Sequence, residues 1–172
     1  LRARAFGMRV IGNARSEKPC PPELDWLGTG ADLHRLLGES DYVLIACPLT
    51  AETEGLIGPA EFAAMKDSAV VINVGRGRVI QEDALYRALS TRTIQGAVID
   101  VWYRYLDKDG ISKRPSDLPF HLLDNVVMTP HNSGWTRAMR QRRWRFVAAN
   151  LDRFARGEPL ENLVLTGSRN AP

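Results

Sequence analysis

Short apolar runs alternate along this chain with segments in which apolar residues recur at helical spacing. The runs predict strands over residues 8–11, 42–46, 70–73, 97–101 and 126–128. The segments between them predict helices over residues 30–37, 59–65 and 82–89. This alternation is typical of an α/β protein. We therefore expect a doubly wound parallel sheet, buried between helices on both of its faces.

A further amphipathic helix is predicted near the C-terminus, where apolar residues fall on one helix face: Trp144, Val147, Leu151 and Phe154. Much of the basic excess behind the net charge of +3 lies in the same segment and mostly on its other faces: Arg137, Arg140, Arg142, Arg143 and Arg145. An exposed or dimer-facing helix explains this pattern better than a nucleic-acid surface does. We expect no nucleic-acid partner.

The 172 residues amount to one domain, with ordinary hydrophobic and charged content. We expect a dinucleotide-binding domain over residues 1–157 and a polar tail over residues 158–172. No run approaches the roughly 20 apolar residues of a membrane span, and we expect neither a signal peptide nor a membrane partner. Cys20 and Cys47 lack the spacing of a disulfide framework or metal site. These features predict a cytoplasmic protein without a metal.

Candidate chemistry follows several predicted strands, at the edge of the sheet where α/β proteins bind ligands. Arg76 follows one strand between two glycines, which we expect to let a ligand approach the backbone. Its guanidinium is suited to clamp a carboxylate. Asp100 ends a second strand and His131 follows a third, where an imidazole can move a proton. Taken singly, the arginine could be a solvated loop residue and the histidine a structural one.

Several sequence blocks then occur in a recognisable order and spacing: Asn73-Val74-Gly75-Arg76-Gly77, Gly96-Ala97-Val98-Ile99-Asp100-Val101 and Thr129-Pro130-His131. Over residues 6–163 the chain resembles the nucleotide-binding domain of the D-isomer-specific 2-hydroxyacid dehydrogenases. The resemblance implies a Rossmann-like fold. It also implies hydride transfer between NAD(P) and a small 2-hydroxy or 2-oxo acid, the substrate partner we expect.

The resemblance implies roles for individual residues. Arg76 orients the substrate carboxylate or keto oxygen, and His131 is the general acid/base. Asp100 accepts a hydrogen bond from the nicotinamide carboxamide. Other residues are implied to line the cofactor: Cys47, Pro48, Thr53, Val74, Gly75 and Gly134. The family also commonly forms homodimers through this domain, so a second copy is an expected partner.

Two departures from the family pattern concern completeness and the catalytic pair. The glycine-rich loop and most of the substrate domain are missing, so we expect an N-terminally truncated Rossmann fold that is inactive by itself. The family usually carries a Glu that orients the histidine, followed by Pro. Here Tyr105 and Leu106 hold these positions, so Tyr105 is the expected catalytic partner of His131, able to hydrogen-bond the imidazole but without a negative charge. Asp107 is an alternative carboxylate.

A third departure concerns the cofactor. Relatives commonly end the second strand of their domain in an acidic residue that binds the adenosine ribose. This chain has Ala14, followed by Arg15 and Ser16. Losing the carboxylate and gaining a cation suits a 2′-phosphate, so NADP is favoured over NAD. The alternative is an NAD enzyme with a solvated loop arginine.

Two other functions stay open at this point. One is a non-catalytic, dinucleotide-sensing dimer module, because some relatives are transcriptional co-repressors. The other is an inactive gene remnant. Arg76 and His131 favour the enzyme, whereas Tyr105 leaves room for the module.

Overall fold

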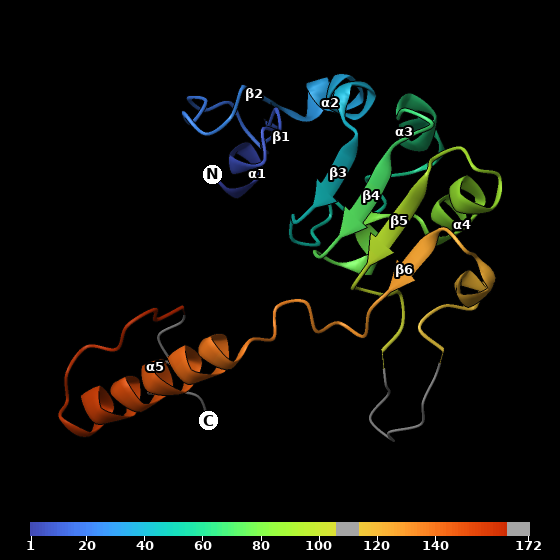
Figure 1. Cartoon of the computed structure of the whole chain (residues 1–172). Helices are drawn as coiled ribbons and strands as arrows, with labels where there is room; N and C mark the ends of the chain where they lie inside the picture. The colour runs from blue at the N-terminus through green and yellow to red at the C-terminus, as the bar shows by residue number, and fades with distance from the viewer. Residues whose placement is uncertain (106–113, 165–172) are drawn as a thin grey trace. The chain divides into compact units, whose positions relative to one another are not determined.

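The computed structural model describes residues 1–105 and 114–164. These residues fall into two compact units, which divide between Ser133 and Gly134. The first unit contains two parallel sheets. One sheet pairs β1 (Ile11–Asn13) with β2 (Trp26–Gly28). The other has the strand order β3-β4-β5-β6, formed by Tyr42–Ile45, Val70–Asn73, Gly96–Ile99 and Val126–Met128 (Figure 1). The predicted α/β fold with a parallel sheet is confirmed.

The helices of the first unit are short and follow the predicted alternation. They are α1 (Arg2–Ala5), α2 (Leu33–Glu39), α3 (Pro59–Ala64) and α4 (Glu82–Ser90), with 3-10 turns η1 (Gly30–Asp32), η2 (Gly77–Val79) and η3 (Phe120–Leu122). Pro59 opens α3 at a position where its missing N–H costs nothing. Gly7, at a φ of +73°, follows α1 and ends it as predicted.

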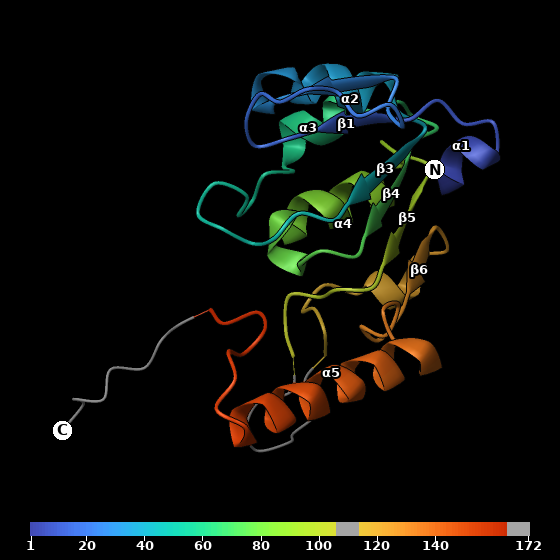
Figure 2. The same ribbon diagram turned by 90° about the vertical axis from the view of Figure 1, so that its left-hand side faces the viewer.

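The hydrophobic core lies against one face of the four-stranded sheet. Val43, Val71 and Ala97 are paired in register and buried, and α2, α3 and α4 supply further buried residues to the same core. Figure 2 shows α3 and α4 on the same side of the strands. Tyr42 and Leu44, which point to the other face, are 57% and 63% exposed. Burial on both faces, which the apolar runs predicted, is therefore wrong for β3 within the described residues.

The first predicted strand is displaced, for a local reason. The predicted range was 8–11, whereas β1 spans Ile11–Asn13. The Asp25 carboxylate accepts a hydrogen bond from the Val10 N–H at 2.7 Å, and the Asp25 N–H donates to the Val10 carbonyl. These two bonds tie Val10 to the turn before β2, and β1 begins at the next residue, three positions after the predicted start.

The second unit is built on α5 (Arg137–Ala155), as the helical pattern predicts. The Thr136 hydroxyl caps the helix by accepting a hydrogen bond from the Met139 N–H at 3.0 Å. The following segment folds back onto the helix through two bonds between Asn150 and Glu161. The apolar face remains exposed, with Phe154 at 73%.

Among the helices of the described residues, none combines the length and the apolar character that crossing a membrane requires. The division into a domain over residues 1–157 and a tail stays a prediction.

Candidate functional site

The four parallel strands bring the candidate residues to one edge of the sheet. Ile45, Asn73, Ile99 and Met128 form a row at or beside the carboxyl ends of β3 to β6. The segments that follow these strands carry Cys47, Arg76, Asp100 and His131. The common direction of the strands therefore places all four segments at the edge where ligands of α/β sheets bind.

The turn after β4 is shaped by a buried amide. Asn73 is 1% exposed, and its side chain donates to the Arg76 carbonyl at 3.1 Å and accepts from the Gly75 N–H at 3.0 Å. The Arg76 side chain is exposed, and its Nη1 donates to the Gly75 carbonyl at 2.7 Å. Asn73 thus fixes the backbone from which Arg76 projects. Its signal in the sequence was a polar residue ending an apolar strand.

The two glycines beside Arg76 serve the packing of the chain. A Cβ on Gly75 would lie 2.8 Å from the Cys47 carbonyl oxygen, and one on Gly77 would overlap the Trp102 carbonyl. Both positions therefore need glycine because neighbouring strand ends press against them. The chain's own backbone thus already requires these glycines, and the expectation that they let a ligand approach the backbone stays a prediction.

An open groove of about 610 Å³ runs along this edge, between the segments that follow β3 and β4. It is lined by Ala46, Cys47, Pro48, Leu49, Val74, Gly75 and Arg76. Five predicted residues, Cys47, Pro48, Val74, Gly75 and Arg76, are thus brought together, whereas His131 does not line the groove. Its wall is partly polar and partly apolar, which suits a flat heterocycle and a sugar.

Asp100 holds the segment that carries His131. Its carboxylate is buried and accepts hydrogen bonds from the Thr129 hydroxyl at 2.6 Å and the Asn132 N–H at 3.0 Å. The N–H and hydroxyl of Ser133 also donate to it. A carboxylate has about four lone-pair sites, and the loop uses most of them. This anchoring role was not visible in the sequence, where Asp100 was interpreted only as a cofactor ligand.

The same contacts determine the charge of this carboxyl group. Burial opposes ionisation, but the donors on Ser133 and Thr129 outweigh it and hold the pKa of Asp100 below its ordinary value. Asp100 is therefore an anion at neutral pH and attracts the N–H groups of the loop.

His131 occupies an unusual backbone conformation next to an aromatic ring. Its φ is +55°, a region that few residues other than glycine adopt. Such conformations are costly and persist where the surroundings enforce them, here the contacts of Asp100 on both sides of the histidine. Trp102 adds a further tie, because its indole N–H donates to the Thr129 carbonyl at 3.1 Å.

Tyr105 lies beside His131 but does not hydrogen-bond to it. The two ring centroids are 5.5 Å apart at an interplanar angle of 46°. The Tyr105 hydroxyl accepts a long hydrogen bond, 3.4 Å, from the Trp102 N–H. The expectation that Tyr105 replaces the usual Glu as a hydrogen-bond partner is therefore corrected to a ring contact. The alternative residue, Asp107, lies outside the described residues, as does Leu106.

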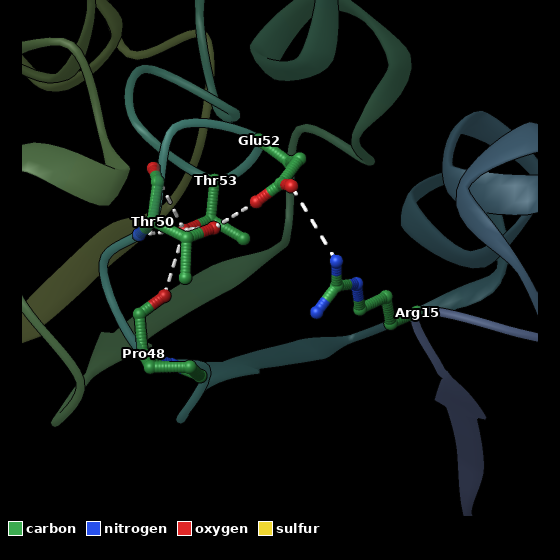
Figure 3. A network of polar contacts seen from close by, with 5 residues as sticks. All are labelled: Arg15, Pro48, Thr50, Glu52 and Thr53. Carbon is green, nitrogen blue, oxygen red and sulfur yellow. Dashed lines mark hydrogen bonds and ion pairs between the residues drawn. The ribbon is translucent and has the colours of Figure 1, made fainter.

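A turn after β3 connects Pro48, which lines the groove, to Arg15 (Figure 3). The Thr53 hydroxyl donates to the Pro48 carbonyl at 2.7 Å and accepts from the Thr50 N–H at 2.8 Å. Thr53 thus fixes the turn after β3. The Glu52 carboxylate in this turn lies 3.5 Å from the Arg15 guanidinium. The structure therefore places Glu52, the chain neighbour of Thr53, against Arg15. Arg15 follows β1 together with Ala14 and Ser16.

The Arg15 segment is tied to β2 at its base and exposed beyond it. The Ala14 N–H donates to the Gly28 carbonyl at 2.9 Å, whereas the Arg15 side chain is 87% exposed. Gly134 begins the second unit, so its implied place beside a cofactor stays a prediction. No group of three or more His, Cys, Asp or Glu side chains suited to a metal ion occurs within residues 1–105 and 114–164.

Comparison with known proteins bears on both the fold and the chemistry. The profile of the family described as "D-isomer specific 2-hydroxyacid dehydrogenase, NAD binding domain" matches residues 1–133. Glyoxylate/hydroxypyruvate reductase B of Pectobacterium carotovorum is 41% identical over 159 residues, 92% of this chain and 47% of that protein. Glyoxylate reductase of Korarchaeum cryptofilum is 38% identical over 168 residues, 95% of this chain and 47% of that protein.

A solved structure gives the same picture. The NADPH-dependent glyoxylate/hydroxypyruvate reductase of Sinorhizobium meliloti, in complex with NADP and sulfate, superposes with a TM-score of 0.71 at 29% identity. The match covers 95% of this chain and 50% of that one. The chain spans about half the length of the curated relatives it matches.

Proposed function

This chain belongs to the D-isomer-specific 2-hydroxyacid dehydrogenases, and from that premise we propose that it forms the dinucleotide-binding part of a 2-oxo acid reductase. The observation that carries the proposal is the shared sheet edge, with Arg76 after β4 and the anchored His131 segment after β6. A cation and an imidazole at one edge can bind an anionic substrate and exchange its proton.

The chemistry divides between the cofactor and these side chains. When bound, the reduced dinucleotide supplies the hydride. The Arg76 guanidinium binds the substrate carboxylate through two parallel hydrogen bonds. The His131 imidazole donates a proton to the carbonyl oxygen as that oxygen gains charge, so the carbonyl group becomes an alcohol. Asp100 fixes the loop of His131 and, as a cofactor ligand, would accept from the carboxamide.

The substrate class follows from this arrangement and from the relatives. An arginine clamp favours a carboxylate next to the reacting carbonyl, as in 2-oxo acids. The similar proteins from Pectobacterium and Sinorhizobium are named glyoxylate/hydroxypyruvate reductases. We therefore propose small 2-oxo acids, of the size of glyoxylate and hydroxypyruvate, as substrates.

Replacing Arg76 by lysine tests the proposal directly. Lysine keeps the charge but loses the fork that matches a carboxylate. In the protein that contains this chain, kcat/KM for glyoxylate should fall about tenfold to hundredfold. The matched control is Arg78→Lys, because Arg78 lies two residues away and pairs with Glu54 at the surface. Equal losses in both variants would contradict the assignment of Arg76.

The cofactor we propose is NADP in preference to NAD. Arg15 is the supporting observation, since its exposed guanidinium stands where many dinucleotide folds read the ribose, and Ala14 brings no carboxylate to repel a 2′-phosphate. The Sinorhizobium relative is described as NADPH-dependent.

The compartment we propose is the reducing cytoplasm. Both cysteines of the chain, Cys20 and Cys47, are free, which supports this location.

A second copy of this chain is the macromolecular partner we propose. Support comes from the exposed apolar face of α5, on which Trp144, Leu151 and Phe154 are at least 64% exposed. Light scattering of the protein should give twice the mass of its chain, and Leu151→Asp should shift it toward the monomer. A monomeric mass for the unmodified protein would exclude the dimer.

One observation favours a non-catalytic module instead. Within the described residues His131 has a ring neighbour but no carboxylate hydrogen-bonded to it. A dinucleotide-sensing dimer needs no oriented acid. It would bind the cofactor yet show no reduction of any 2-oxo acid, which a turnover assay with glyoxylate distinguishes.

A further inference from the structure

We propose that Glu52 discriminates between the two nicotinamide cofactors, because its carboxylate competes with a ribose 2′-phosphate for Arg15 and offers an acceptor to an unphosphorylated ribose. The inference rests on the proposed dinucleotide function and concerns the part of the site that reads the adenosine ribose. Nothing in the pattern around Ala14 and Arg15 pointed to this residue, which lies 37 positions further along the chain.

The geometry gives Glu52 a fixed direction. Its Oε2 accepts a hydrogen bond from the Thr50 hydroxyl at 2.6 Å, while its Oε1 faces the Arg15 Nη2 at 3.5 Å (Figure 3). Thr50 is itself held in the turn that Thr53 closes. One carboxylate oxygen is thus anchored by the turn, and the other is presented to the guanidinium.

The charge of Glu52 is assured by the same contacts. The Thr50 hydroxyl bond, the backbone of Glu52 and then the Arg15 charge lower the pKa of this carboxyl below its ordinary value. Both partners are mostly exposed, 87% for Arg15 and 65% for Glu52. The ion pair is therefore weak and easily opened, which leaves the guanidinium available to a ligand.

The two cofactors meet this pair differently. A 2′-phosphate carries about −1.5 to −2 charge, so it must displace Glu52 from Arg15 and then stand near a like charge. A ribose with free hydroxyls donates hydrogen bonds, which a carboxylate accepts. Arg15 thus favours the phosphorylated cofactor and Glu52 the unphosphorylated one, and their balance sets the preference.

The experiment measures dissociation constants of NADPH and NADH by fluorescence titration of the protein that contains this chain. Glu52→Gln removes the charge and keeps the size of the side chain. The affinity ratio should move toward NADPH by about threefold to tenfold, the size of one screened charge interaction at contact range. The gain should shrink as salt is raised, because exposed charges are screened.

Two further variants separate this role from a general change in charge. Glu54→Gln removes the same charge two residues along the turn, where the carboxylate pairs with Arg78 instead, and should leave the ratio unchanged. In the Arg15→Ala background, Glu52→Gln should produce a smaller gain, because no guanidinium remains for the two anions to contest.

Each outcome has a distinct meaning. A raised ratio in Glu52→Gln alone supports the inference. An unchanged ratio, or the same rise in Glu54→Gln, overturns it while the proposed function stands, provided that the unmodified protein binds a dinucleotide. Binding of neither cofactor to the unmodified protein would overturn the proposed function and the role of Glu52 together.

Discussion

Replacing Asp100 by asparagine should lower the free energy of unfolding by about 2–4 kcal/mol. The carboxylate is buried and accepts from two side chains and two backbone N–H groups. Asparagine keeps the shape but presents an NH₂ group to donors such as the Ser133 N–H, which then lack a partner. Urea unfolding followed by circular dichroism measures the change.

The stabilisation by Asp100 should depend on pH in a defined direction. Because the pKa of Asp100 is lowered in the folded state, its ionised form stabilises the fold. That stabilisation is fully present above the pKa of the unfolded state, near the ordinary value of 3.8, and is lost as pH falls through the lower pKa of the folded state. The difference between the unmodified protein and Asp100→Asn should therefore shrink below about pH 4.

A matched variant tests whether burial is the cause. Asp124 lies just before β6, but its side chain is 81% exposed and pairs with Arg92 at the surface. Asp124→Asn removes the same charge and should change the unfolding midpoint little. If both variants lose similar stability, the network around Asp100 is not the source of the effect.

The strands show which parts of the fold the local sequence predicts. The ranges of β4 and β6 agree with the prediction to the residue, because each is a short run that begins with β-branched residues of high strand propensity. β2 was missed, since Trp26–Gly28 is a three-residue strand after a proline-rich segment and carries no alternation of its own. Its pairing with β1 is a tertiary effect.

The glycines around Arg76 show that a sequence pattern can single out residues without revealing the packing that requires them. Their presence was a signal in the sequence, but their purpose depends on which backbone lies against them. That backbone is the Cys47 carbonyl for Gly75 and the Trp102 carbonyl for Gly77. Neither neighbour can be read from the chain without the sheet order, since each comes from a different strand end.

The anchoring role of Asp100 was missed for the same reason, because it depends on residues that are distant in the sequence. Its partners Thr129 and Ser133 lie 29 and 33 residues further along the chain. Parallel pairing of β5 with β6 is what brings them together. Tyr105 is the opposite case. Its closeness to His131 agrees with the position that the family resemblance gave it, whereas its ring contact depends on the rotamer of the tyrosine side chain.

Replacing His131 by asparagine should lower kcat/KM for 2-oxo acid reduction by about a hundredfold to ten-thousandfold, the usual contribution of a positioned acid. Asparagine is the informative substitution because it tolerates positive φ better than most residues, and the backbone here has a φ of +55°. The loop held by Asp100 should therefore keep its shape, and only proton transfer is lost.

Measuring cofactor binding and turnover separately shows whether His131 acts in proton transfer alone. The dissociation constant of the dinucleotide should change little in His131→Asn, since the groove lined by Cys47, Val74 and Arg76 does not include the histidine. His121→Asn, the same substitution at an exposed residue of η3, serves as the control and should leave the rate unchanged. Full activity in the His131→Asn variant would show that His131 is not the general acid of this site. A protein that binds dinucleotide but shows no turnover with or without His131 would instead favour the sensing module, because the anchored loop would then shape a binding surface without transferring a proton.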